Sequence, residues 1–420
     1  MTFIARFAGA ALYAALALLA IAAPAAAQPA DPDGQPVTIL ISIDGFRTDY
    51  LNRGITPNLS ALAARGASAP MKPSFPTKTF PNHYTLVTGL RPDHHGIVSN
   101  NMIDPRRPAV RFSLGDARQA LDPFWWDEAE PLWVTAERAG IRTATMFWPG
   151  SEVAIRTIRP SDWNRFDQNI DERQRVETVL DWMRRPAEIR PRFVAIYFDR
   201  IDTDGHHFGP DSAELNAAVA EVDSQIGYLI DGLAALGQQA DIIVVSDHGM
   251  RAVDAARTID LDALLAPESY LLVDSGPFAT IEPAAATDRT VYDALLTPHD
   301  HMQCWQKDDI PARLAYGSNP RVAEILCLAE AGWTIRRGAP PEEMSGGTHG
   351  WDNEDPQMQA LFIAAGPRIS TTTPVRNLDN VDVYALLAAL VGVAPQPNDG
   401  DEDALVLFAA PEPGADRLLE

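Results

Sequence analysis

The stretch that decides the fold is Val37-Thr38-Ile39-Leu40-Ile41-Ser42-Ile43, and it runs directly into Asp44. Its apolar residues follow one another with little of the apolar–polar alternation that marks a strand with one wet face. Such a run suits a strand that is buried on both faces, as strands of parallel sheets are. The stretch therefore predicts a central strand of a parallel sheet, with a carboxylate at its end.

Other apolar runs along the chain have the same character. They span residues 143–148, 193–198, 241–246 and 360–365. Asp202 follows one of these runs, and Asp247-His248 follows another. Because ligands bind beyond the carboxyl ends of the strands in open α/β sheets, Asp44, Asp202 and Asp247-His248 are expected to meet at one edge.

Helical segments lie between these runs. Thr56 is a good N-cap residue, Pro57 suits the first helical position, and Gly66 supplies a stop. Residues 214–236 and 381–390 are also predicted to be helices. The alternation of strands and helices predicts an α/β fold, a mainly parallel sheet with helices on both faces.

The N-terminus has the composition of a secretory signal. One positive side chain, Arg6, precedes an apolar core at 11–23, and small residues around Ala27 offer a cleavage site. The apolar core is short for a membrane span of roughly 20 residues, so cleavage is favoured over an uncleaved anchor. The mature protein is therefore expected to be periplasmic or secreted, with no stable membrane span.

Between residues 256 and 344 the strand–helix pattern weakens, and prolines recur in loop-like stretches. We interpret this segment as a smaller lobe inserted into the main sheet. Its cysteines, Cys304 and Cys327, can form a disulfide in an oxidising compartment, although the sequence alone does not decide the pairing. The predicted organisation is a signal peptide (1–27), a linker (28–36), a catalytic α/β domain (37–255 plus 345–410), the inserted lobe (256–344) and a tail (411–420).

The charge balance argues against one class of partner. In 420 residues, 57 Asp and Glu face 34 Lys and Arg, for a formal net charge of −23. A nucleic-acid strand is a poor partner for such a surface, because phosphate contacts need Lys and Arg. A small anionic substrate stays compatible if bound cations reverse the local field. The oligomeric state stays open.

Carboxylates, imidazoles and one hydroxyl make up the candidate site. They are Asp44, Thr79, Asp202, His206, Asp247, His248 and His349. Glycines around His349 allow the backbone to approach a crowded site. Asp and neutral His are ordinary zinc ligands and also suit manganese or iron. Two adjacent divalent ions, with zinc favoured, are a recurring device for displacement at phosphorus.

Thr79 lies in a proline-bounded loop, Pro76-Thr77-Lys78-Thr79-Phe80-Pro81, before a predicted helix. A free threonine is a weak nucleophile, but a metal can lower its pKa and orient it. The N-terminus of the following helix would also favour a phosphate. Taken alone, Thr79 is an ordinary N-cap, and only its combination with the metal ligands makes it a candidate nucleophile.

Several segments resemble the nucleotide pyrophosphatase/phosphodiesterase family of the alkaline phosphatase superfamily. Around the candidate nucleophile they are Lys78-Thr79-Phe80-Pro81-Asn82-His83 and Thr88-Gly89-Leu90-Arg91-Pro92-Asp93-His94-His95-Gly96-Ile97. Elsewhere they are Asp44-Gly45-Phe46-Arg47, Ser246-Asp247-His248-Gly249-Met250 and Thr348-His349-Gly350-Trp351-Asp352-Asn353. The resemblance covers residues from about 37 to 401 and implies an alkaline phosphatase-like fold.

The resemblance implies a role for each candidate residue. Thr79 is the expected nucleophile, and the Asn100 amide and the Thr79 backbone N–H are expected to stabilise the transition-state oxygens. The ligands of the metal next to Thr79 would be Asp44, Asp247 and His248. The ligands of the second metal would be Asp202, His206 and His349.

The implied reaction is cleavage of a nucleotide-type phosphodiester or pyrophosphate through a phosphothreonine intermediate, with release of a nucleoside monophosphate. Phe80, Trp148 and Phe166 are expected to bind the nucleobase. One alternative is a phosphomonoesterase or phosphonate hydrolase that uses the same ligands. Another is a metal- or nucleotide-binding protein without turnover, and the intact Thr79 argues against it.

Overall fold

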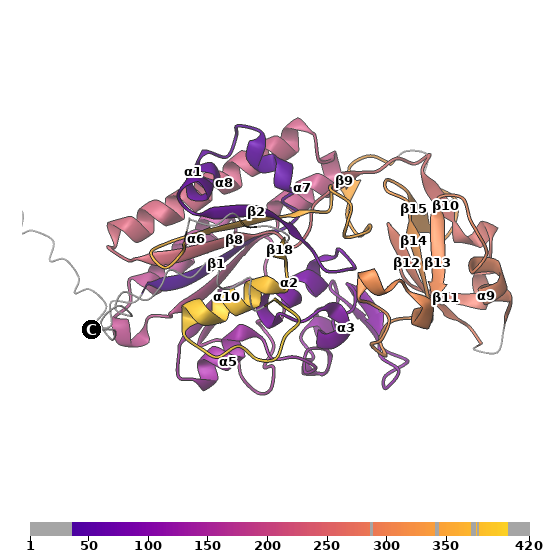
Figure 1. Cartoon of the computed structure of the whole chain (residues 1–420), viewed down its shortest axis with the longest axis horizontal. Helices are drawn as coiled ribbons and strands as arrows, with labels where there is room; N and C mark the ends of the chain where they lie inside the picture. The colour runs from indigo at the N-terminus through magenta and orange to yellow at the C-terminus, as the bar shows by residue number, and fades with distance from the viewer. Residues whose placement is uncertain (1–35, 286–288, 341–343, 371–374, 376–377, 402–420) are drawn as a thin grey trace, which may run out of the picture.

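The centre of the molecule is an eight-stranded sheet (Figure 1). The computed structural model describes residues 36–285, 289–340, 344–370, 375 and 378–401, so the predicted signal peptide, the tail and nearly all of the linker lie outside it. Across the sheet the strands are β18 (Leu378–Asp379), β2 (Ala67–Lys72), β17 (Ala360–Ala365), β8 (Ala240–Val245), β1 (Val37–Ile43), β7 (Phe193–Phe198), β5 (Thr143–Met146) and β6 (Asp162–Asn164).

Most of this sheet is parallel, as the sequence predicts. β8, β1, β7, β5 and β6 all run in one direction, whereas β17 is antiparallel to both of its neighbours. The prediction that residues 360–365 form another parallel strand is therefore wrong about the direction of this strand. Burial on both faces does not encode direction, and β17 follows the His349 loop, which already lies at the carboxyl edge of the parallel strands.

Both faces of the sheet are covered by helices, which confirms the predicted α/β architecture. Successive side chains of β1 point to opposite faces, so Ile39 and Ile41 join one hydrophobic cluster and Leu40 joins the other. On the first face lie α1 (Pro57–Arg65), α6 (Glu172–Met183), α7 (Arg200–Phe208) and α8 (Ala213–Ala235). On the second face lie α2 (Thr79–Thr88), α5 (Leu132–Arg138) and α10 (Asp382–Val391).

Helix α1 begins and ends where the sequence predicts, but its N-terminus is capped differently. Thr56 occupies the N-cap position, yet its hydroxyl donates to the carbonyl of Leu51. The backbone N–H groups of Asn58 and Leu59 instead donate to the carboxylate of Asp223 on α8. The negative charge at the helix N-terminus thus comes from a neighbouring helix, which local sequence does not reveal.

A second, antiparallel sheet lies in the segment 256–344 and has its own hydrophobic cluster. Its strands, in order, are β11 (Tyr270–Asp274), β12 (Phe278–Pro283), β14 (Ile325–Ala329) and β13 (Met302–Gln306). Around it lie α9 (Arg289–Leu295), β10 (Thr258–Asp260) and β15 (Thr334–Arg336). We propose that 256–344 is the inserted lobe, a name used below for this segment.

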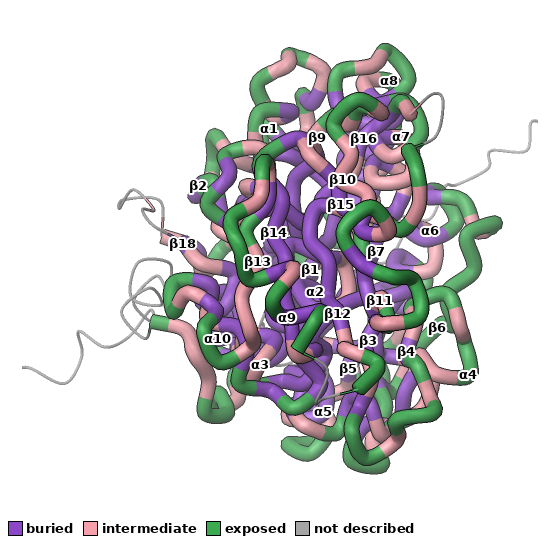
Figure 2. The backbone as a smooth tube through the Cα atoms, turned by 90° about the vertical axis from the view of Figure 1, so that its right-hand side faces the viewer, coloured by how far each residue is buried: buried purple, intermediate pink, exposed green. Residues whose placement is uncertain are grey.

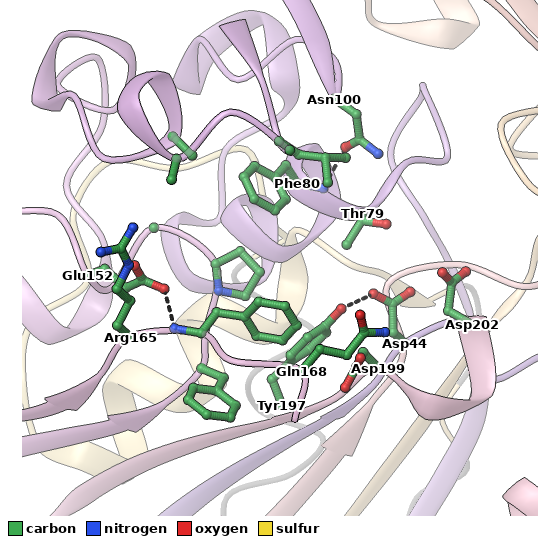
Figure 3. A pocket seen from close by; sticks show the side chains of 18 of the residues that line it. Asp44, Thr79, Phe80, Asn100, Glu152, Arg165, Gln168, Tyr197, Asp199 and Asp202 are labelled. Carbon is green, nitrogen blue, oxygen red and sulfur yellow. Dashed lines mark hydrogen bonds between the residues drawn. The ribbon is translucent and has the colours of Figure 1, made fainter. Parts of the chain in front are cut away.

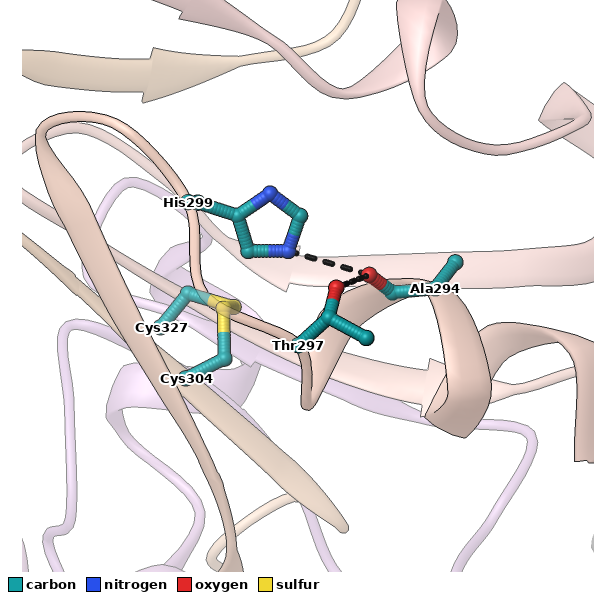
Figure 4. Close-up of a disulfide and its surroundings, with 5 residues drawn as sticks. All are labelled: Ala294, Thr297, His299, Cys304 and Cys327. Carbon is teal, nitrogen blue, oxygen red and sulfur yellow. Dashed lines mark hydrogen bonds between the residues drawn. A yellow bond between two sulfur atoms is a disulfide. The ribbon is translucent and has the colours of Figure 1, made fainter.

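The inserted lobe carries the disulfide. Cys304 on β13 lies directly opposite Cys327 on β14, and their sulfur atoms are bonded, 1.98 Å apart (Figure 4). The pairing that the sequence leaves undecided is therefore present in the structure. The bond ties together the edge strand and its neighbour.

The lobe does not stand apart from the main sheet. Phe278 and Tyr316 of the lobe both pack edge-on against Phe75, with ring centroids 5.9 and 5.3 Å away. These three rings belong to the hydrophobic cluster on the α2 face of the eight-stranded sheet. The lobe therefore shares a core with the rest of the chain, which we call the main unit. Within the described residues, no helix is both long and apolar enough to cross a membrane.

Candidate active site

Seven predicted site residues converge at the carboxyl edge of the parallel strands. They come from the ends of β1 (Asp44) and β8 (Asp247, His248), from α7 (Asp202, His206), from the loop after β16 (His349; β16 is Gly347–Thr348) and from the first residue of α2 (Thr79). The sequence predicts Thr79 in a loop, whereas it begins the helix itself. The meeting of these segments at one edge agrees with the argument from parallel strands.

The first group of ligands gathers around one imidazole nitrogen. His248 Nε2 lies 2.9 Å from Asp247 Oδ2 and 3.4 Å from Asp44 Oδ1. Thr79 Oγ1 lies 3.3 Å from the same nitrogen. We call Asp44, Asp247 and His248 the inner set, because their side chains are at most 1% exposed.

The second group lies beside the first and is more open to solvent. Asp202 Oδ1 lies 3.4 Å from His206 Nε2 and 3.7 Å from His349 Nε2. Asp202 and His206 are one helical turn apart on α7, so they share a face. We call Asp202, His206 and His349 the outer set. The rings of His349 and His248 stack at 3.5 Å and join the two sets.

Backbone carbonyls fix the tautomer of all three imidazoles in the two sets. The Nδ1 atoms of His206, His248 and His349 lie 2.8, 2.9 and 2.8 Å from the carbonyl oxygens of Gly347, Gly249 and Thr77. A carbonyl oxygen only accepts, so each Nδ1 donates its hydrogen there. Each Nε2 then presents a lone pair to the site, which is the arrangement of metal-ligating histidines.

Buried carboxylate oxygens without a hydrogen-bond partner complete this picture. Among the described residues, Asp44 Oδ1, Asp202 Oδ1 and Asp247 Oδ2 are such atoms. They are the same oxygens that face the Nε2 atoms at 2.9–3.7 Å. Tetrahedral zinc ligands at about 2.1 Å from the ion lie roughly 3.4 Å from one another. Residues of both sets fall within the groups of described side chains that could hold a metal ion, which are Asp202, His248 and His349, and Asp44, His83 and Asp247.

The charges of the buried site residues favour a bound cation. Burial, with the negative charges of Asp247 and Asp202, raises the pKa of Asp44 well above its ordinary value. Burial also lowers the pKa of His349, and the neighbouring His248 lowers it further. Buried carboxylates beside neutral imidazoles are costly unless positive charge compensates them. Divalent ions at the two sets would supply that charge.

Glycines let these segments approach one another, as the sequence predicts. Gly45, directly after Asp44, has φ +67°, and a Cβ there would lie 3.1 Å from Asp202 Cα. A Cβ on Gly346 would lie 2.0 Å from the carbonyl oxygen of His206. Larger residues at these positions would push the outer set away from the inner set.

Tyr197 and His83 belong to the site, although sequence reasoning missed both. The Tyr197 hydroxyl donates to Asp44 Oδ2 at 2.6 Å, which leaves Oδ1 facing His248. His83 Nδ1 lies 3.4 Å from Asp247 Oδ2 and 2.8 Å from the Thr79 carbonyl. Because that carbonyl accepts, His83 Nδ1 carries a hydrogen and is no metal ligand, although it lies close to two carboxylates. The only sequence signal was a polar residue on a buried strand or helix.

Thr79 sits between the metal sets and a substrate-sized cavity. As the first residue of α2, it places its own backbone N–H at the helix N-terminus, a position that favours an anion. The next N–H, of Phe80, donates to Asn100 Oδ1 at 3.0 Å, so the Asn100 amide nitrogen is turned the other way (Figure 3). The structure thus brings Thr79, Phe80 and Asn100 together.

The cavity has a volume of about 580 Å³ and aromatic walls (Figure 3). Its lining includes Phe80, Trp126, Phe147, Pro149 and Phe166. Phe147 and Phe166 meet edge to face, with centroids 5.4 Å apart. Such a slot has the size and the apolar walls for a flat ring such as a nucleobase.

Trp148 does not line this cavity, in contrast to the sequence interpretation. Its side chain is fully buried and packs against His83, with ring centroids 5.1 Å apart. The reason is local: β5 ends at Met146, and Phe147 adopts a left-handed φ of 70°. This turn places Phe147, not Trp148, on the cavity wall.

Comparisons with known proteins identify a matching family and similar relatives. A family model described as type I phosphodiesterase / nucleotide pyrophosphatase matches residues 38–352. The bis(5'-adenosyl)-triphosphatase enpp4 of Xenopus laevis is 39% identical over 369 residues, which cover 87% of this chain and 80% of the relative. Human ectonucleotide pyrophosphatase/phosphodiesterase family member 5 is 36% identical over 372 residues, which cover 88% of this chain and 77% of the relative.

A solved structure has a similar fold and sequence. It is murine ectonucleotide pyrophosphatase/phosphodiesterase 5, an inactive threonine-to-alanine variant in complex with AMP. It superposes with a TM-score of 0.84 at 33% identity, over 89% of this chain and 100% of the murine chain.

Proposed function

The chain belongs to the type I phosphodiesterase / nucleotide pyrophosphatase family, and we propose that it cleaves nucleotide-type phosphodiesters or pyrophosphates and releases a nucleoside monophosphate. Family membership confirms the resemblance seen in the motifs and makes the protein a hydrolase. The observation that carries the proposal is the placement of Thr79 Oγ1 at 3.3 Å from His248 Nε2, between two ligand sets and an aromatic cavity.

The inner and outer sets would each hold one divalent ion, and we propose zinc for both. Bound there, the two ions would supply Lewis acidity for the attacking and leaving oxygens of an in-line displacement. Two Asp and one His on the inner set, and one Asp and two His on the outer set, are donors that zinc accepts. The fixed Nδ1 hydrogens of the imidazoles support this assignment.

Thr79 would be the nucleophile. Its Oγ1 forms a bond to phosphorus as the bond to the leaving oxygen breaks, and water then hydrolyses the phosphothreonine ester. The Thr79 backbone N–H and the amide nitrogen of Asn100 would donate to the phosphoryl oxygens as charge builds up on them. The inactivity of the murine relative's threonine-to-alanine variant supports a threonine in this role.

The aromatic slot would bind the nucleobase. Phe80 and Phe166 both line the cavity and would offer aromatic surface to a flat ring. Phe166 keeps 42% of its surface exposed, which is a large exposure for an aromatic residue without a ligand. The AMP bound to the murine relative supports a nucleoside monophosphate as product.

The position of Lys78 disfavours a phosphomonoesterase. A monoester carries an extra negative charge and is usually held by an Arg or Lys clamp. The Lys78 ammonium is buried and donates to the carbonyl of His349 at 3.1 Å, away from the cavity. Arg165 does line the cavity, but at the end far from Thr79 (Figure 3). A diester, with one charge fewer, fits this environment better.

The test compares p-nitrophenyl thymidine monophosphate with p-nitrophenyl phosphate, after chelation and zinc add-back. We expect zinc-dependent turnover of the diester that exceeds turnover of the monoester, and its loss in Thr79→Ala. Thr178→Ala, a half-buried threonine on α6 away from the cavity, is the matched control and should keep full activity. A preference for the monoester would overturn the substrate class, and turnover by Thr79→Ala would overturn the nucleophile.

We also propose export by the leader at 1–27, which lies outside the described residues. The names of two relatives begin with "ectonucleotide", which supports an extracytoplasmic location. N-terminal sequencing of protein recovered from the periplasm or medium should give a chain that starts near Gln28. An intact Met1 in that fraction would contradict cleavage.

A further inference from the structure

Asn100 lies between two polar residues that both reach into the inserted lobe. The Ser99 hydroxyl donates to Asp274 Oδ2 at 2.5 Å, and the Asn101 side-chain amide donates to Asp274 Oδ1 at 3.2 Å. Asp274 is the last residue of β11 and is 6% exposed. One carboxylate of the lobe thus holds the residues on both sides of Asn100, one with each oxygen.

The two strands that follow Asn100 are docked on the same part of the lobe. They form the antiparallel pair β3 (Asn101–Ile103) and β4 (Arg111–Ser113), and Figure 2 shows them beside β11. The Arg111 guanidinium donates to the carbonyl of Val273, next to Asp274. The Asn100 carbonyl in turn accepts from the N–H of Leu114, at 3.1 Å. The backbone of Asn100 is therefore tied to a hairpin that is itself fixed on β11.

Arg321 of the lobe bonds to residues before and after Asn100 in the sequence. Its guanidinium donates to the Gly96 carbonyl at 2.6 Å and to Asp104 Oδ2 at 2.8 Å. It also donates to the carbonyl of Trp125, at 2.8 Å, next to the cavity wall. The Arg321 side chain is 1% exposed, so these bonds are made without competition from water. The lobe therefore makes hydrogen bonds to the chain before Asn100, to both residues next to it, and to the chain after it.

We propose that Asp274 is a positioning residue for phosphoryl transfer, through which the inserted lobe holds the Asn100 amide in place. The inference rests on the proposed function, because it assumes that Asn100 contacts the transition state. An amide that stabilises a transition state has to be held to within about 0.5 Å of its working position. Within the part of the chain that the structure describes, the Asn100 side chain has one hydrogen bond, which its oxygen accepts from the Phe80 N–H of the main unit.

The choice of aspartate fits this role. Its two oxygens accept from two different side chains at once, and they also accept from the Ser275 N–H at 2.9 Å. Asparagine would keep one acceptor oxygen for Asn101, and the Ser99 hydroxyl could rotate to accept from the new amide. Asp274→Asn is therefore a conservative variant, whereas Asp274→Ala leaves both flanking donors without their partner.

The test is a double-mutant cycle on zinc-loaded full-length protein with p-nitrophenyl thymidine monophosphate. The variants are Asp274→Ala, Asn100→Ala and the double variant. We expect Asn100→Ala to lose about 100-fold in kcat and Asp274→Ala to lose about 10-fold with little change in KM. The double variant should be no slower than Asn100→Ala, because a displaced amide and a missing amide have the same effect.

Further variants separate positioning from a general effect on folding. Asp262→Ala removes another lobe aspartate, whose partners Tyr270 and Arg337 lie within the lobe, and should keep full turnover. Asp274→Asn should recover most of the lost kcat, and it keeps the test open if Asp274→Ala does not fold.

The outcomes distinguish this inference from the proposed function. If Asp274→Ala lowers kcat equally with and without Asn100, or not at all, the inference is overturned while the proposed function stands. If Asn100→Ala itself keeps full turnover, the role of Asn100 in the proposed function fails, and the inference fails with it.

Discussion

The inner and outer ligand sets use similar chemistry at different depths. The inner set extends from β1 and β8, adjacent strands in the middle of the sheet, and its side chains are at most 1% exposed. In the outer set, Asp202 and His206 lie on α7 with side-chain exposures of 18% and 36%. A central sheet is the most rigid support in such a fold, whereas a helix with a glycine-rich loop is easier to move. We therefore expect the inner ion to be held permanently and the outer ion to exchange.

The strongest test of this comparison is removal of an inner ligand. Asp247→Ala should lower turnover of the thymidine diester by about 1,000-fold, because losing an ion removes several kcal/mol of transition-state stabilisation. Excess zinc should not restore activity, since Asp247 also accepts from the N–H of Gly45 at 3.2 Å and orders the loop after β1. Zinc per chain after gel filtration gives the direct readout.

The control for this prediction is Asp181→Ala, an exposed aspartate on α6. It should keep two ions per chain and normal turnover. An Asp247→Ala protein that recovers activity in excess zinc would show that the inner set is no tighter than the outer set.

Removal of an outer ligand should have a smaller and reversible effect. His206→Ala should lower turnover by about 100-fold at limiting zinc, and millimolar zinc should restore part of it, because the remaining outer ligands still offer a weak site. Zinc titration of turnover measures this effect. His207→Ala is a close control, because His207 is the next residue on α7 and is exposed. If His206→Ala is insensitive to added zinc, the outer ion does not exchange as proposed.

A change that leaves every ligand in place should sharpen the comparison further. Tyr197→Phe removes the hydroxyl that donates to Asp44 Oδ2, so Asp44 loses its fixed orientation. We expect zinc affinity of the inner set to fall about 10-fold, with the outer set unchanged. Competition with a chelator resolves the two affinities. Tyr228→Phe, which removes a half-buried hydroxyl on α8 that donates to Glu177, is the control. Equal weakening of both sets would mean that Tyr197 acts on the fold and not on the inner set.

The inner and outer sets also differ in how the sequence predicts their residues. Ligands that follow buried parallel strands, such as Asp44 and Asp247, are predictable because continuous apolar runs locate the strands and topology brings their ends together. His206 follows from its spacing of four from Asp202 on what proves to be a helix. The family resemblance assigns these residues to two metals, and that assignment stays a prediction.

What the sequence does not reveal depends on local turns and on contacts between distant segments. The direction of β17 is set by where the preceding loop lies, not by its own residues. Phe147 lines the cavity wall where the sequence analysis expects Trp148, because Phe147 adopts a left-handed φ. The contact of Asp274 with the Asn100 segment joins residues 175 positions apart, and no local pattern signals it.

Another buried imidazole, His95, shows what burial costs without a metal. His95 is fully buried outside both sets; its Nδ1 accepts from the Ile97 N–H, so its Nε2 donates to the Thr85 hydroxyl at 3.0 Å. Burial lowers its pKa from 6.5 to about 3. The folded protein therefore keeps His95 neutral while the unfolded chain gains a proton below pH 6.5. Stability from this group is complete above pH 6.5 and is lost as the pH falls toward 3.

His95→Gln should remove this pH dependence while keeping a donor and an acceptor at the position. Between pH 7 and pH 6 the wild type should lose about 0.7 kcal/mol of unfolding free energy that the variant keeps. Urea unfolding of zinc-saturated protein at both pH values measures the difference. Zinc saturation matters, because protons also compete with metal for the imidazoles of the two sets. If wild type and His95→Gln lose the same stability between these pH values, the sensitivity to acid lies in the metal sets and not in this buried histidine.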